Sequence, residues 1–204
     1  TGLMKPTKGS VELNDRDITK MYPNELREAG IGIIPEDRYR QGLCLSLPVS
    51  HNLVTGYHKK RRFCKFNVMN FKEIKKNKDE LVDEYDIRLS GKDPLVSSLS
   101  GGNGQKVIVA REFSNNPKVL LASQPTRGID VGATEFVHQN ILRMRDEGKA
   151  VFLISSELTE IKSLADRIIV IYDGEIVGEF KEEEVSFNEL GLYMSGAKRM
   201  TRSE

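Results

Sequence analysis

Short apolar runs alternate along this chain with longer stretches in which apolar residues recur at helical spacing. Continuous runs at 30–34, 118–122 and 150–154 are rich in branched aliphatic residues and predict buried strands. Apolar positions three and four residues apart predict helices over 131–147 and 157–164. Buried strands that alternate with helices predict an α/β fold with a mostly parallel sheet.

The two ends of the chain carry a different pattern. Residues 11–13 alternate as a half-buried strand does, and Asn-Asp closes the segment. The Asp-Gly pair at 173–174 lies between apolar runs at 167–172 and 175–180, which predicts a hairpin. A last helix is expected over 186–194.

Composition excludes several classes of protein. The 204 residues carry a formal charge of +1, so no overall field points to nucleic acid. No run of about 18 apolar residues occurs, and no segment is expected to span a bilayer. Cys44 and Cys64 lack a metal-binding spacing and are expected to stay reduced, with a disulfide between them as the alternative. His51, His58 and His138 are expected to be surface or packing residues, so no metal site is predicted.

From about residue 48 to residue 116 the chain is more polar and its pattern is helical. Within it, 59–78 holds nine basic residues and one acid, Glu73. Such a run is most often a solvated surface. The alternatives are a contact with anionic headgroups or with an acidic partner, and, less favoured, a nucleic-acid footprint.

The sequence Leu-Ser-Gly-Gly-Asn-Gly-Gln-Lys at 99–106 precedes apolar positions at helical spacing. Ser100 is a good N-cap, and two glycines leave the backbone open to close approach. The free N–H groups and the dipole of a helix start favour an anion. A bare Ser-Gly-Gly would be a plain capped helix. The full motif, followed by Gln-Pro-Thr-Arg-Gly-Ile-Asp at 124–130, favours a phosphate-binding element.

At these residues the chain resembles the ATP-binding-cassette (ABC) ATPases. Residues 99–105 resemble the signature motif, 118–124 the Walker B strand and 126–130 the D-loop. The resemblance implies a nucleotide-binding role for Ser100, Gly101, Gly102 and Asn103 of the signature, and an interface role for Arg127, Gly128 and Asp130 of the D-loop.

The resemblance covers essentially the whole chain. It implies a P-loop-NTPase-like core over 1–45 and 117–204 and a helical subdomain with the signature motif over 46–116. Pro-Glu-Asp-Arg at 35–38 and Asn103 resemble the second cassette of simple-sugar and nucleoside importers. Ser-Gln-Pro at 123–125 is most similar to the nucleoside-uptake branch.

Several parts of an ATP site depart from the family pattern. No Gly-x-x-x-x-Gly-Lys-Ser/Thr loop occurs, and residues 1–6 resemble the segment after the P-loop helix, so we expect an N-terminally truncated cassette. Ser123 stands where an aspartate would help to hold Mg²⁺, and Gln124 where a glutamate would polarise water. Ser156 replaces the switch histidine, and Glu36 the Q-loop glutamine. These degenerate positions predict weak nucleotide binding and very slow hydrolysis by this half.

In this family two cassettes pair head to tail, so each signature serves the ATP of the partner. The resemblance therefore implies that ATP and Mg²⁺ bind at a site shared with an N-terminal cassette of the same polypeptide, and that this isolated half is inactive. The implied partners are transmembrane permease subunits and, indirectly, an extracytoplasmic substrate-binding protein, with no nucleic acid. The implied location is the cytoplasmic face of the cell membrane. The alternatives are an inert pseudo-cassette scaffold, or a non-transport cassette that acts on ribosomes or DNA.

Overall fold

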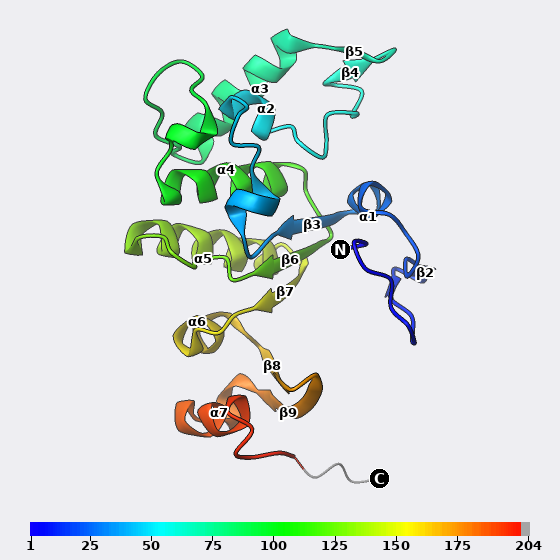
Figure 1. Cartoon of the computed structure of the whole chain (residues 1–204), viewed down its shortest axis with the longest axis vertical. Coiled ribbons are helices and arrows are strands. Elements are labelled where there is room, and N and C mark those ends of the chain that lie inside the picture. The colour runs from blue at the N-terminus through cyan, green and yellow to red at the C-terminus, as the bar shows by residue number, and fades with distance from the viewer. Residues whose placement is uncertain (201–204) are drawn as a thin grey trace. The chain divides into compact units, whose positions relative to one another are not determined.

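The chain forms two compact units, Thr1–Phe152 and Leu153–Glu204, which we describe separately. The computed structural model describes residues 1–200 (Figure 1). The elements of the first unit, whose last strand runs two residues past its boundary, are β1 (Glu12–Leu13), β2 (Arg16–Asp17), α1 (Pro23–Ala29), β3 (Ile31–Ile34), η1 (Arg38–Gly42), α2 (Val49–Asn52), β4 (Cys64–Lys65), β5 (Val68–Met69), α3 (Phe71–Glu84), η2 (Val96–Ser98), α4 (Gly101–Ser114), β6 (Val119–Ser123), α5 (Val131–Asp146) and β7 (Ala150–Ile154).

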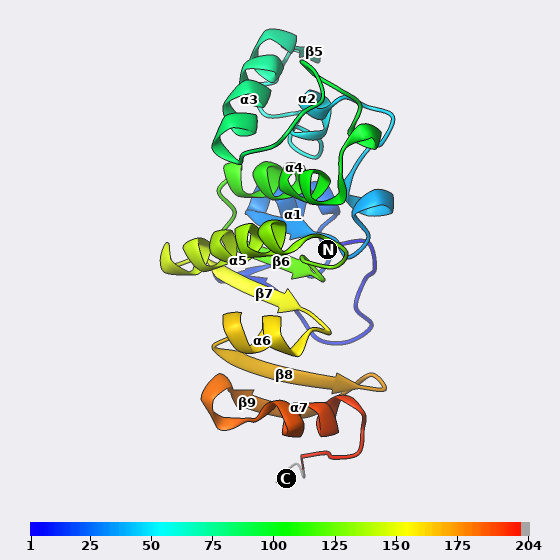
Figure 2. The ribbon, with the colours of Figure 1, turned by 90° about the vertical axis from the view of Figure 1, so that its left-hand side faces the viewer.

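A three-stranded sheet in the order β3-β6-β7 is central to the first unit. Strands β3 and β6 pair in parallel, with Ile31 opposite Val119 and Ile34 opposite Ala122. Helix α4 packs on β3 and beside α5, and α1 also packs against β3 (Figure 2). Since β3 and β6 are parallel, their carboxyl ends reach the same edge of the sheet, where the predicted Q-loop and Walker B positions follow.

The expected elements are largely confirmed, with three corrections. The run at 150–154 predicts a buried strand, but Phe152 is 53% exposed, because β7 is the edge strand of the sheet that the structure describes and is paired on one side only. The segment at 11–13 turns back through Asn14 and Asp15, both at positive φ, and pairs with the unpredicted strand β2.

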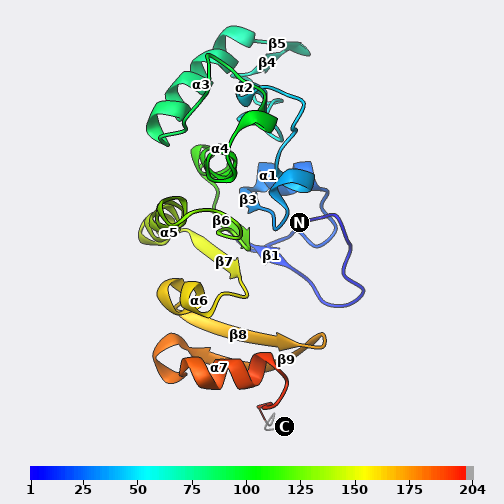
Figure 3. The same cartoon turned by 60° about the vertical axis from the view of Figure 1, so that its left-hand side comes forward.

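The polar region, whose pattern predicts helices, also contains two short strands that were not predicted. An antiparallel hairpin, β4–β5, occurs inside it, with Cys64 opposite Met69 (Figure 3). Its two-residue turn at Phe66 and Asn67 has positive φ at both positions, and Phe there hides the usual turn signal from sequence analysis. The expected division into 1–45 with 117–204 and 46–116 stays a prediction.

The second unit contains α6 (Leu158–Leu164), β8 (Arg167–Tyr172), β9 (Glu175–Lys181), η3 (Glu182–Glu184) and α7 (Phe187–Met194). Strands β8 and β9 form the antiparallel hairpin that the Asp-Gly turn predicts. The N-cap of α7 is Ser186, whose hydroxyl accepts from the Glu189 N–H. The apolar faces of this hairpin and helix enclose a separate core of Ile168, Val170, Val177, Val185, Leu190 and Tyr193.

Candidate functional site

The predicted signature motif forms the first turn of α4. The Ser100 Oγ accepts hydrogen bonds from the Asn103 N–H at 3.4 Å and from the Asn103 Nδ2 at 3.0 Å. The Asn103 Oδ1 in turn accepts from the Arg88 N–H at 2.8 Å. The first N–H groups of an α-helix have no partner within the helix, so this turn presents donors to an anion. Asn103 thus holds the N-cap serine and the preceding loop together.

The predicted Q-loop and D-loop segments meet through Arg38. Its guanidinium donates to the carbonyl oxygens of Arg127 at 2.7 Å and Gly128 at 2.8 Å. Glu36 forms an exposed ion pair with Arg127 at 2.8 Å, which contributes about 0–1 kcal/mol to stability. Asp37 caps η1, its carboxylate accepting from two backbone N–H groups. The loop that follows β3 is therefore joined to the loop that follows β6.

The glycines of the signature lie directly against the D-loop. A Cβ atom at Gly102 would lie 2.9 Å from the Asp130 Oδ2, and one at Gly101 would lie 3.3 Å from the Gly128 oxygen. Asp130 caps α5 by accepting from the Ala133 N–H at 2.9 Å. A side chain at Gly102 would therefore force the capping carboxylate of Asp130 or the start of α5 to move.

A buried bond links the same helix to the D-loop from inside. The Gln105 Nε2 donates to the Pro125 oxygen at 2.7 Å, and Gln105 is only 2% exposed. The structure thus brings the predicted signature, Q-loop and D-loop residues into one junction.

The predicted catalytic positions lie at the end of a strand or just after one. Ser123 ends β6, and Gln124 follows it with a φ of +46°. Ser156 is exposed and follows β7 in the second unit. A hydroxyl at 123 and an amide at 124 offer neutral oxygens only, whereas Mg²⁺ prefers carboxylates. Within residues 1–200, no three His, Cys, Asp or Glu side chains cluster as metal ligands would. These two positions therefore do not fit a catalytic Mg²⁺.

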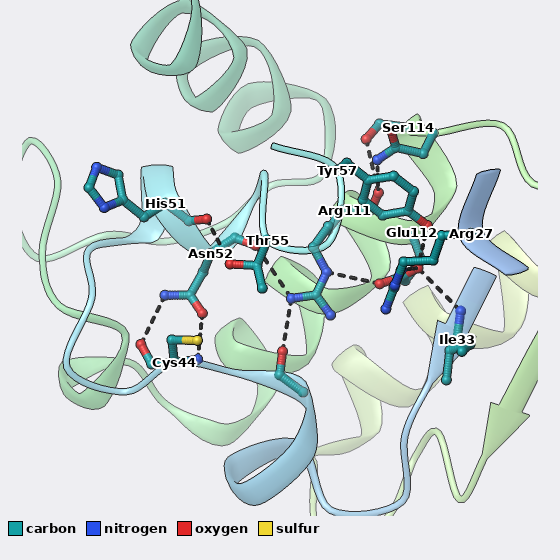
Figure 4. A network of polar contacts seen from close by, with 12 residues as sticks. Arg27, Ile33, Cys44, His51, Asn52, Thr55, Tyr57, Arg111, Glu112 and Ser114 are labelled. Atoms are coloured by element: carbon teal, nitrogen blue, oxygen red, sulfur yellow. Dashed lines mark hydrogen bonds and ion pairs between the residues drawn. The ribbon is translucent and has the colours of Figure 1, made fainter. Parts of the chain in front are cut away.

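Sequence analysis missed a buried polar network behind the junction (Figure 4). The fully buried Glu112 Oε2 accepts from the Arg27 guanidinium at 2.7 Å, the Tyr57 hydroxyl at 2.7 Å and the Ile33 N–H at 3.2 Å. The Glu112 Oε1 accepts from the Arg111 Nε at 2.9 Å. The network connects α4 with α1, with β3 and with the loop after α2. A Glu beside an Arg within the apolar stretch 107–113 was its signal in the sequence.

The network continues towards α2. The Arg111 guanidinium donates to the Gly42 oxygen at 2.8 Å. Asn52, which is fully buried, donates to the carbonyl oxygens of Cys44 and Pro48 and accepts from the Cys44 N–H. Side chains of Arg111 and Asn52 therefore help to hold the segment between η1 and α2, together with backbone hydrogen bonds to residues 94–97.

The electrostatics of the network favour an ionised glutamate. Burial by itself raises the pKa of Glu112, but the guanidinium groups of Arg111 and Arg27 outweigh it and hold this pKa below its ordinary value. Burial also raises the pKa of Tyr57, and the Glu112 carboxylate raises it further. Tyr57 therefore remains a hydrogen-bond donor at neutral pH.

The family follows from the sequence match. Residues 1–127 match the family described as ABC transporter, so the chain belongs to the ABC transporter family. It is 45% identical over 196 residues to the nucleoside import ATP-binding protein NupA of Lactococcus lactis, and 43% identical over 197 residues to the guanosine import ATP-binding protein NupO of Bacillus subtilis. These alignments cover 96% and 97% of this chain but 39% of each relative, so the chain spans about two fifths of their length.

Solved structures confirm the cassette fold. A dimeric post-hydrolysis state of an ATP-binding cassette bound to ADP and Pi superposes with a TM-score of 0.72 at 26% identity, over 88% of this chain and 76% of that one. A nucleotide-free cassette from an ABC transporter gives a TM-score of 0.73 at 23% identity, over 93% of this chain and 76% of that one. The predicted P-loop-NTPase-like α/β fold is therefore confirmed. No helix within residues 1–200 is both long and apolar enough to cross a bilayer.

Proposed function

We propose that this chain is a nucleotide-binding cassette of an ABC importer, and that its signature helix completes the ATP site of a partner cassette. The proposal rests on the contrast between the signature turn of α4 and positions 123 and 124. The first turn of α4 keeps its N-cap, its glycines and its contact with the D-loop, while positions 123 and 124 have lost both carboxylates. A cassette with an intact anion-binding turn, but without carboxylates at its own catalytic positions, is suited to contact the ATP that a partner cassette binds.

The chemistry follows from the residues present. The Ser100 hydroxyl and the first N–H groups of α4 would donate to phosphate oxygens of ATP presented by the partner, with the positive end of the helix dipole behind them. In the site of this half, Gln124 can orient a water molecule but cannot take its proton at neutral pH. The predicted result is one working site and one degenerate site per pair.

The substrate and the partners are inferred from the relatives. The printed names of NupA and NupO refer to nucleoside and guanosine import, and those of more distant relatives refer to ribose and xylose import. We therefore propose that the complete protein energises uptake of nucleosides, with simple sugars as the alternative class. The length of the relatives leaves room for a second cassette in the same polypeptide. Transmembrane permease subunits and an extracytoplasmic binding protein complete the proposed importer, at the cytoplasmic face of the membrane.

The test is Ser100→Arg in the complete transporter, with ATP hydrolysis and nucleoside uptake as the readouts. The arginine would occupy the space that a phosphate needs, and loss of such a donor set costs about 100-fold in rate. The matched control is Ser114→Arg, which places the same side chain at the other end of the same helix, where a cation is favourable. Normal hydrolysis and uptake in the Ser100 variant would favour the inert scaffold instead.

A second measurement directly distinguishes a shared ATP site from an inert scaffold. If the signature completes a shared site, ATP promotes association of the two cassettes, and Ser100→Arg abolishes this effect. A scaffold that binds no nucleotide would associate equally well with and without ATP.

A further inference from the structure

The β4–β5 hairpin has two unlike faces. On its inner face, Met69 packs against the cluster formed by Val54, Phe63 and Ile74. Side chains alternate along each strand, and Lys65 lies opposite Val68 in the register, so these two share the other face. Val68 is 71% exposed and Lys65 is also exposed. The hairpin is therefore anchored on one side and presents a cation and an apolar side chain on the other.

The turn of the hairpin carries a large aromatic side chain in an unfavourable place. Phe66 is 90% exposed, and its φ is +50°. The left-handed region suits Asn or Gly and is rare for bulky residues, so turn geometry does not explain a Phe here. The Lys65 ammonium lies 5.6 Å from the centroid of the phenyl ring, a contact that leaves the ring almost fully exposed. The turn lies at the end of the hairpin that points away from α2 and α3 (Figures 1 and 3). The phenyl ring is thus displayed at a projecting tip.

The basic residues around the hairpin divide into two groups. Arg62 pairs with Glu73 at 3.4 Å and Glu80 at 2.8 Å, which ties the hairpin stem to α3. Lys78 is buried and pairs with Asp79, and Lys76 faces Glu80 at 3.8 Å. Among residues 1–200, the remaining cations of the run have no carboxylate within ion-pair distance and are exposed: Lys59, Lys60, Arg61, Lys65, Lys72 and Lys75. Lys59 and Lys60 line a hollow together with Pro23 and Asn24 of α1. The other four cations lie on the hairpin or on the segments next to it in sequence, Arg61 just before β4, Lys65 in β4, and Lys72 and Lys75 in α3.

We infer that the β4–β5 hairpin forms, with Arg61, Lys65, Lys72 and Lys75, a membrane-contact surface, which we call the basic hairpin surface, and that it binds anionic phospholipid. Basic side chains near an anionic leaflet each strengthen binding, and aromatic and aliphatic side chains insert at the headgroup level. A projecting tip with one aromatic ring suits a soft bilayer interface. This inference goes beyond the proposed function and does not depend on which cassette hydrolyses ATP.

The test is flotation of the purified ATP-binding subunit with vesicles, in the absence of permease. Vesicles of equal parts phosphatidylcholine and phosphatidylglycerol are compared with vesicles of phosphatidylcholine alone. We expect binding only to the anionic vesicles. It should weaken as salt rises from about 0.1 M to about 1 M, because the screening length falls from about 10 Å to about 3 Å. Equal binding to the neutral vesicles would overturn the inference.

Two variants test the surface itself. Phe66→Asn removes the ring and places a residue that tolerates the turn, so the thermal midpoint should not fall while vesicle affinity falls about tenfold. Lys65→Gln leaves the turn intact and should lower vesicle affinity about fivefold. The matched controls are Phe187→Asn on α7 and Lys8→Gln, both exposed and outside the basic hairpin surface, which should leave affinity unchanged.

Unchanged flotation of both surface variants would refute the lipid assignment. If the same variants also assembled less well with permease subunits, the hairpin would be a protein-docking element instead.

Discussion

The buried carboxylate of Glu112 offers the sharpest test of how this cassette is held together. Glu112→Gln keeps the size of the side chain but removes its charge. Three donors converge on Oε2 and one on Oε1, so an amide cannot satisfy all four. If the Gln oxygen replaces Oε2, its NH₂ group faces the Arg111 Nε–H, and the reverse orientation sets NH₂ against three donors.

The expected cost is large because two cations lose their partner. The side chain of Arg111 is 3% exposed and that of Arg27 is 18% exposed. Breaking a buried ion pair by removing one partner costs about 3–5 kcal/mol, since the other charge stays buried. We expect a loss of this size in the free energy of unfolding of the first unit. Tyr57→Phe is the graded comparison, and removes one bond to a charged group for about 1.5–3 kcal/mol.

The assay is urea unfolding followed by circular dichroism, combined with hydrogen exchange of the Ile33 amide. That amide donates to Glu112, so its exchange reports the network locally and is not confused by the second unit. Accelerated exchange at Ile33 with little change in the second unit is the expected pattern. A cost below about 1 kcal/mol for Glu112→Gln would refute the argument that the carboxylate balances both guanidinium groups.

The stability difference between the wild type and Glu112→Gln has a predictable pH dependence. The pKa of Glu112 is lower in the folded state than its ordinary value of 4.5. Its contribution to stability is therefore fully present above about 4.5 and is lost as the pH falls through the folded-state pKa. The difference in unfolding free energy between the wild type and Glu112→Gln should be constant near neutrality and shrink under acid. A difference that grows with acid would contradict the direction of the shift.

Three further predictions concern the junction and its support. Gly102→Ala should cost about 1–3 kcal/mol and slow ATP hydrolysis in the complete transporter, because its Cβ would lie 2.9 Å from the Asp130 carboxylate; unchanged thermal unfolding would show that the contact relaxes freely. Asn52→Ala should cost at least about 2 kcal/mol in urea unfolding, since it leaves buried carbonyl groups without a donor, and a cost near zero would mean that water replaces the amide. Arg38→Lys should loosen the link to Gly128, seen as faster amide exchange in the D-loop; exchange equal to the wild type would remove Arg38 from the coupling.

The hydrophobic pattern and the motif spacing predicted most of the fold of this cassette. Helix α5 and strands β3, β6 and β8 lie within one or two residues of the expected ranges, because continuous apolar runs and helical spacing reflect burial directly. The hairpin of the second unit was predictable from Asp-Gly, which carries its own turn geometry. The β4–β5 hairpin was not, because Phe66 conceals a turn that the tertiary packing of Met69 stabilises.

The candidate site divides in the same way. The sequence by itself determined the signature turn, the neutral residues at 123 and 124, and the family, because these depend on residue type and spacing along one segment. Only the tertiary structure decided that Arg38 joins the D-loop, that Gly102 lies against Asp130, and that Glu112 collects donors from α1, β3 and the loop after α2. Local sequence propensities determine helices, strands and turns. Contacts between segments that are distant in sequence depend on tertiary packing, because a buried charge or amide is stable only where all its hydrogen-bond donors and acceptors converge.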